Sequence, residues 1–141
     1  MTVVDANVLL YAVDEEAENH ELARDWLLGV LRSKETVVLP WVSLLAFLRI
    51  STSPRIYPTP LTVEEASEVV DAWLSRPNVV PATGGREHWG ILRSLLETSG
   101  AGGNLVTDAH VAAFALEMGA TVTTFDNDFG RFPGVEWRRP S

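Results

Sequence analysis

Short runs of β-branched and apolar residues recur along the chain, each bounded by polar or turn-forming residues. They cover residues 2–4, 36–39, 78–80, 121–124 and 135–137. Runs of this length and composition are typical of buried strands. The pattern therefore predicts five short strands.

Segments with a helical spacing of apolar residues lie between these runs. They cover residues 7–13, 15–31 and 41–50, a helix that opens at Leu61-Thr62 and stops at Pro77, residues 86 to about 98, and residues 105–118. Thr62 and Glu65 fit a capping box, and Gly119 suits the position that follows the last helix. Three tryptophans fall on stripes that we expect to face the core: Trp26, Trp73 and Trp89.

Strands and helices thus alternate along the whole chain, which predicts a parallel-sheet α/β sandwich with right-handed crossovers. The chain has no internal repeat, low-complexity tract or long linker, and its 141 residues suit one domain over 1–141. A hydrophobic fraction of 46% and a charged fraction of 21% are those of a folded protein.

Composition excludes several kinds of site. There are no cysteines, so disulfides, thiolate metal sites and cysteine nucleophiles are ruled out. The net charge of −8 counts against a protein that coats nucleic acid, but not against an enzyme that binds phosphates through metal ions. Apolar runs too short to cross a bilayer and the lack of a signal-peptide pattern lead us to expect a cytoplasmic protein without membrane contact.

Four acids stand where a sheet enzyme would carry them. Asp5 follows the first strand, Asp108 lies early in a helix, and Asp126 and Asp128 follow the strand 121–124. Open α/β sheets hold ligands at the carboxyl ends of their strands, so we expect these carboxylates to gather around a divalent metal. Mg²⁺ and Mn²⁺ prefer oxygen ligands, and grouped carboxylates without a cation would raise one another's pKa values.

Each acid also has a purely structural interpretation. Asp5 suits an N-cap, with Asn7 as a second capping residue. Asp108 suits the first turn of any helix, because the helix dipole favours an acid there. Asp126 and Asp128 suit an Asx-type turn. The order of the acids along the chain, rather than any one of them, favours the metal site.

Three segments together resemble a known family. They are VDANVLLYAVDE, GNLVTDAHVAAFALEMGATVTTFDNDFGRFPG and the closing VEWRRP. The sequence is similar to PIN-domain ribonucleases, specifically VapC-type toxins of type II toxin–antitoxin systems, over essentially its whole length. The resemblance implies a three-layer α/β/α sandwich with a central parallel sheet, RNA cleavage dependent on Mg²⁺ or Mn²⁺, a homodimer, and inhibition by a cognate antitoxin.

The resemblance also implies roles for single residues. Asp5 and Asp108 match the metal-binding acids of the family. Asp126 matches the acid that follows the last core strand, and Asp128 the supporting acid beside it. Asn7 and Thr124 match polar residues that orient the acids.

One departure concerns the helix 41–50. The family usually carries a glutamate there, whereas here Leu44 or a neighbour occupies the place, and no acid lies between Thr36 and Thr62. Arg49 on this apolar helix either contacts substrate phosphate or forms an ion pair with a site carboxylate.

The leading hypothesis is thus a metal-dependent endoribonuclease toxin. Because of the missing glutamate, the alternative is a PIN-like module that has lost cleavage and acts through antitoxin or RNA binding. A phosphatase-like enzyme with Asp5 as nucleophile ranks lower, because the only lysine, Lys34, lies in the wrong kind of segment. The apolar helices 41–50 and 61–73 support the expected homodimer.

Overall fold

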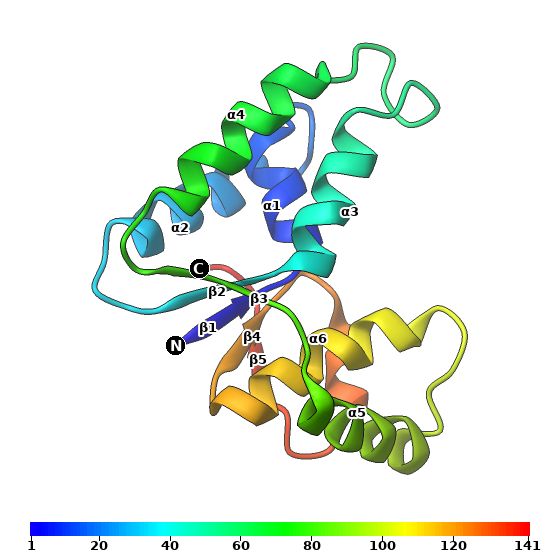
Figure 1. The fold of residues 1–141 in the computed structure, drawn as a ribbon. Coiled ribbons are helices and arrows are strands. Elements are labelled where there is room, and N and C mark those ends of the chain that lie inside the picture. Colours follow the sequence, from blue (N-terminus) through cyan, green and yellow to red (C-terminus); the bar gives the residue numbers. More distant parts are fainter.

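A five-stranded parallel sheet forms the centre of the protein. The computed structural model describes all residues, Met1–Ser141, and Figure 1 shows the sheet between two groups of helices. The strand order is β3-β2-β1-β4-β5. The strands are β1 (Thr2–Val4), β2 (Val37–Pro40), β3 (Val79–Ala82), β4 (Thr121–Thr123) and β5 (Trp137–Arg138).

Alternating side chains of the strands serve two separate cores. Val3 of β1 pairs with Val38 of β2 and Val122 of β4, and all three are buried in one core cluster. The next residues along, Val4 and Leu39, are buried in the other cluster. Since successive side chains of a strand point to opposite faces, this alternation requires cover on both sides of the sheet.

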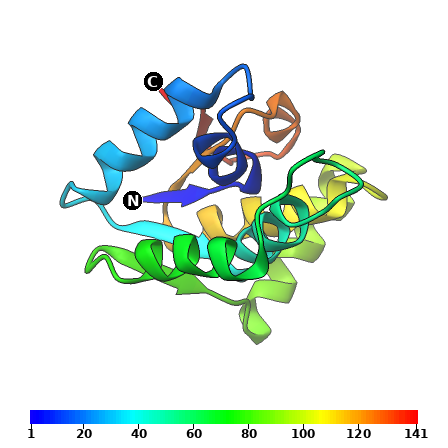
Figure 2. The same cartoon turned by 90° about the horizontal axis from the view of Figure 1, so that it is seen from above.

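The helices supply that cover in two layers. α1 (Ala6–Val13), α2 (His20–Leu31), α3 (Trp41–Ser51) and α4 (Val63–Leu74) contribute to the first core cluster, and α5 (Arg86–Ser99) and α6 (Leu105–Met118) to the second. Figure 1 shows the two groups on opposite faces of the sheet, and Figure 2 looks onto the side covered by α1–α4. The predicted three-layer α/β/α sandwich is confirmed. None of the six helices combines the length and apolar character that a membrane span requires.

Two helix ends follow their sequence signals closely. Thr62 caps α4 in a full capping box: its side chain accepts from the Glu65 backbone N–H, and the Glu65 carboxylate accepts from the Thr62 backbone N–H, both at 3.0 Å. α6 ends at Met118, and Gly119 after it has a φ of 64°. The left-handed conformation costs glycine little, so the chain turns here directly into β4.

Two predictions about helices are wrong. The helix expected from residue 15 begins at His20, because Asp14 caps the preceding helix through a backbone bond to Leu10 and turns fill the acidic stretch that follows. Trp89 does not face the core: it is 59% exposed, and its neighbour His88 is buried in its place. Trp73 is buried as expected.

The strand order creates a topological switch point between β1 and β4. The chain moves from β1 outward to β2 and β3, then crosses back to β4 on the other side of β1. The carboxyl ends of β1 and β4, which pair in parallel, therefore lie side by side. In open α/β sheets this is where ligands bind.

Candidate metal centre

Asp5 is fixed at the carboxyl end of β1. Its backbone N–H donates to the Thr123 carbonyl of β4 at 3.1 Å, which continues the sheet by one residue. Its carboxylate Oδ1 accepts the Ala6 N–H at 2.8 Å and so caps α1. The strand therefore turns into a helix at Asp5, and the carboxylate stays at the edge of the sheet.

Polar side chains tie this carboxylate to the end of β4. The Thr124 hydroxyl donates to Asp5 Oδ2 at 2.8 Å, and the Asn7 amide donates to the same oxygen at 3.2 Å. Asn7 Oδ1 accepts the Phe125 backbone N–H at 3.1 Å, and Thr124 Oγ1 accepts the Asp126 N–H at 2.9 Å. The network holds the loop after β4 against the start of α1, so its acids lie near Asp5.

The remaining three acids form a tight group. Asp108, Asp126 and Asp128 each offer a carboxylate oxygen, and these oxygens all lie within 4.8 Å of one another. Asp126 Oδ1 accepts the Asp128 N–H at 2.8 Å, which starts the short 3-10 helix η1 (Asn127–Arg131). Asp108 reaches the group because α6 begins at the carboxyl edge of the sheet, with Asp108 in its first turn, and then runs back toward the start of β4.

Burial and the neighbouring negative charges raise the pKa values of two acids of the site. The pKa of Asp108 is raised from 3.8 to about 7, first by burial and then by the charges of Asp5, Asp126 and Asp128. The pKa of Asp5 is also raised, chiefly because burial disfavours its charged form, although its hydrogen bonds to Thr124 and Ala6 oppose this. The site is therefore strained electrostatically when no cation is present.

The donor set fits a hard divalent cation. Oxygens that coordinate one Mg²⁺ at ~2.0–2.1 Å are about 3–4 Å apart, and the three grouped carboxylate oxygens lie within 4.8 Å of one another. No histidine or cysteine belongs to this group. The arrangement thus suits Mg²⁺ or Mn²⁺ better than the softer metals that nitrogen and sulfur ligands select.

The residues singled out from the sequence differ in how they lie relative to the group of three acids. Asp5 lies close enough for its charge to act on Asp108 but outside the tight group of three. Arg49 is exposed in the last turn of α3 and forms no ion pair. Leu44 is fully buried in the core cluster on the α1–α4 side of the sheet, so α3 presents an apolar side chain where an acid was expected.

Two features were missed from the sequence. Arg131 lies beside Asp128, with Nε 3.4 Å from Oδ1, an i,i+3 spacing that the sequence itself contains. On the far side of α6, His88 Nε2 is 2.8 Å from His110 Nδ1, and His88 Nδ1 is 3.0 Å from Glu117 Oε2. No local pattern signals that cluster, because it joins α5 to α6 only in the folded chain.

Comparisons with known proteins agree with this fold. The sequence matches the family model of the PIN domain over residues 2–135. It is 45% identical over 140 residues to Ribonuclease VapC37 of Mycobacterium tuberculosis, which covers 99% of this chain and 97% of that protein.

Two solved structures share the fold. VapC20 of M. tuberculosis, described as a sarcin-ricin loop cleaving toxin, has a TM-score of 0.69 at 17% identity and covers 96% of this chain and 99% of its own. DNA-bound VapBC of Salmonella typhimurium has a TM-score of 0.68 at 20% identity, with 99% and 98% covered.

Proposed function

The chain belongs to the PIN domain family, and we propose that it is an endoribonuclease toxin that uses Mg²⁺ or Mn²⁺ to hydrolyse RNA. The observation that carries the metal dependence is the group of three carboxylates at the switch point of the sheet. The observation that supports ribonuclease activity is the full-length similarity to a protein named as a ribonuclease.

The four acids have separate roles in this proposal. Asp108, Asp126 and Asp128 hold the cation, because their oxygens are grouped at a suitable spacing. Asp5 already accepts hydrogen bonds at both carboxylate oxygens and contributes chiefly its negative charge. Thr124 keeps Asp5 and the loop after β4 in position.

A divalent ion bound here would lower the pKa of a water molecule and offset charge on the phosphodiester. Without the ion, four carboxylates would repel the phosphates of RNA, and the chain as a whole carries a net charge of −8. The site itself therefore makes RNA binding depend on the cation. Arg131, whose Nε lies 3.4 Å from Asp128 Oδ1, places a positive charge at the edge of the group of acids.

Two protein partners belong to the proposal. The Salmonella neighbour is a VapBC complex, which supports a cognate antitoxin for this chain. Trp41 and Leu45 of α3 are exposed large apolar side chains, which supports a second copy of the chain on this face. Sedimentation of a monomer at micromolar concentration would contradict the homodimer.

The test is RNA cleavage by the purified, antitoxin-free protein with Mg²⁺ or Mn²⁺ and with chelator. We expect cleavage only with metal, and its loss in Asp108→Asn. Asp71→Asn is the matched control, because Asp71 is an exposed acid of α4 outside the site. Equal cleavage by Asp108→Asn and the wild type would contradict the proposal.

The alternative of a module without cleavage rests on the missing glutamate alone. It is not favoured, because the relatives carry ribonuclease names and four acids remain around the site. Metal-dependent binding of RNA with no product in the same assay would favour that alternative.

A further inference from the structure

Arg139 follows the edge strand β5 at the carboxyl edge of the sheet. β5 pairs in parallel with β4, with Thr123 opposite Arg138, and the Thr124 N–H donates to the Arg138 carbonyl at 3.0 Å. Arg139 is therefore level with the residues that follow β4, the loop that carries Asp126. Because parallel strands end at the same edge of a sheet, the side chain of Arg139 begins beside the candidate metal centre.

Two contacts with Phe125 hold the guanidinium of Arg139. Its Nη1 donates to the Phe125 carbonyl oxygen at 2.9 Å, and its Cζ lies 5.2 Å from the centroid of the Phe125 ring, a distance at which the ring attracts a cation. Phe125 is itself fixed, because its N–H donates to Asn7 Oδ1 at 3.1 Å and its ring lies 5.4 Å from that of Tyr11. The next residue, Pro140, is buried, so Arg139 does not belong to a loose tail.

The charge of Arg139 is not neutralised within the chain. The side chain is exposed, and it takes part in none of the ion pairs of the protein. A guanidinium has several N–H donors, and the Phe125 carbonyl is the one acceptor that Arg139 contacts. In a chain with a net charge of −8, this side chain therefore keeps its charge and its remaining donors for a ligand outside the chain.

A second arginine lies on the same side of the acids. Arg131 belongs to η1, and its Nε is 3.4 Å from Asp128 Oδ1. η1 lies against β5, since a methyl group at Gly130 would meet the Trp137 indole nitrogen at 3.5 Å. Arg131 and Arg139 thus come from neighbouring segments, and the surface on the β5 side of the metal centre is basic.

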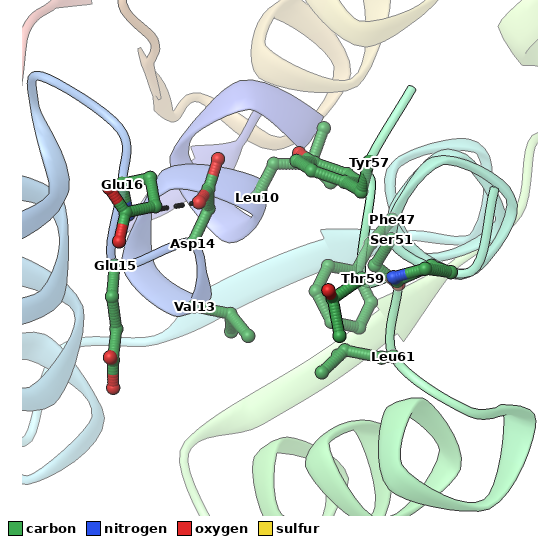
Figure 3. Close-up of a pocket in the computed structure, with 11 residues that line it drawn as sticks. Leu10, Val13, Asp14, Glu15, Glu16, Phe47, Ser51, Tyr57, Thr59 and Leu61 are labelled. Carbon is green, nitrogen blue, oxygen red and sulfur yellow. Dashed lines mark hydrogen bonds between the residues drawn. The ribbon is translucent and has the colours of Figure 1, made fainter. Parts of the chain in front are cut away.

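The far end of α1 carries the opposite charge. Asp14, Glu15 and Glu16 line a pocket between α1, α3 and the connection from α3 to α4, and Figure 3 shows their carboxylates on one side of it. None of the three forms an ion pair. Phosphates that leave the metal centre in this direction meet charges of their own sign. An RNA strand is therefore favoured on the β5 side.

We propose that Arg139 binds a phosphate of the RNA strand beyond the one at the metal, on the β5 side, and so positions the scissile phosphate among the acids. This inference rests on the proposed function. A planar guanidinium can donate two N–H groups to one phosphate. Since Phe125 already holds the side chain, less conformational freedom is lost when RNA binds. A contact with phosphate carries no sequence information, so it acts on any single strand.

The test is the salt dependence of RNA binding by the full chain. The probe is a short fluorescein-labelled oligouridine with Ca²⁺, which takes oxygen ligands as Mg²⁺ does. Fluorescence anisotropy gives Kd over a series of KCl concentrations, and a gel verifies that the RNA stays intact. We expect Arg139→Gln to bind about 2–5-fold more weakly at low salt. We expect its slope of log Kd against log salt to be smaller by about 0.7, as the loss of one phosphate contact to a single strand predicts. Arg139→Lys keeps the charge and should keep the wild-type slope.

Arg138→Gln is the matched control. Arg138 is the exposed neighbour of Arg139, and its Nη2 lies 3.7 Å from Glu35 Oε2. The substitution changes the net charge equally, and we expect the wild-type slope.

Three results would overturn the inference while the proposed function stands. The first is a lower Tm of Arg139→Gln with the wild-type slope, as expected if Arg139 only ties the chain end to Phe125. The second is an equal change of slope in Arg138→Gln and Arg139→Gln. The third is a wild type that cleaves RNA but does not bind the oligouridine. Absence of metal-dependent cleavage by the wild type would overturn both proposals.

Discussion

Replacement of Asp108 by asparagine is expected to change how the stability of the metal-free protein depends on pH. The pKa of Asp108 is raised from 3.8 to about 7 in the folded state by burial and by three neighbouring acids. Between these two values the folded state holds a proton that the unfolded state has released. The contribution of Asp108 to the free energy of unfolding is therefore fully present below about pH 4, and it is lost as the pH rises through about 7.

The size of this effect follows from the gap between the two pKa values. A gap from 3.8 to about 7 corresponds to about 4 kcal/mol at most. Because Asp108 is only half-buried, solvent screens these interactions, and we expect about 1–2 kcal/mol. For a domain of this size, that is a rise in Tm of about 3–6 °C for Asp108→Asn over the wild type at pH 8, with little difference at pH 4.

The assay is thermal unfolding with chelator from pH 4 to pH 9, followed by the same scans with Mn²⁺. Asparagine has a similar shape but no charge, so it relieves the repulsion and also weakens the metal site. We expect Mn²⁺ to stabilise the wild type at pH 8 and to stabilise Asp108→Asn much less. Asp71→Asn should match the wild type throughout. An Asp108→Asn variant with the wild-type pH slope and the wild-type response to Mn²⁺ would refute the electrostatic argument.

Three further predictions follow from single contacts. Leu44→Glu does not raise cleavage and lowers the free energy of unfolding by about 3–5 kcal/mol in urea titrations, because Leu44 is fully buried among apolar side chains; a stable, more active variant would contradict this. Thr124→Val removes the hydroxyl that donates to Asp5 at 2.8 Å and lowers kcat/KM for RNA about 10–100-fold. An unchanged kcat/KM would contradict the role of this hydroxyl in holding Asp5. Thr62→Ala removes the side chain that accepts from Glu65 and lowers the free energy of unfolding by about 1 kcal/mol, with cleavage unchanged.

Local sequence signals predicted those parts of the fold that depend on local interactions. The last helix was predicted with its true bounds, Leu105–Met118, because Gly119 supplies the left-handed residue that ends it. The capping box of Thr62 and Glu65 needs only residues three apart, and it is present.

Predictions that depended on distant partners were less accurate. In α5 the spacing of apolar residues did not distinguish Trp89 from His88 as the inward residue. His88 is buried because Glu117 and His110 of α6 satisfy both of its ring nitrogens. The acidic stretch after Asp14 has helix-forming residues, but α1 ends at Asp14 and the next helix begins only at His20.

The candidate site was predictable to the extent that strand order was. Asp5, Asp108 and Asp126 stand at strand or helix ends that a parallel sheet brings to one edge. Their relative closeness was not predictable: Asp128 joins Asp108 and Asp126 in the tight group, whereas Asp5 is turned toward Thr124 and Asn7. That difference comes from the hydrogen bonds between β1 and the loop after β4.

The most direct measurement is a crystal structure of the protein grown or soaked with Mn²⁺, with anomalous diffraction to locate the ion. We expect an anomalous peak among the carboxylates of Asp108, Asp126 and Asp128, within about 2.0–2.3 Å of their oxygens. A fully occupied peak elsewhere, with these carboxylates free of metal, would contradict it.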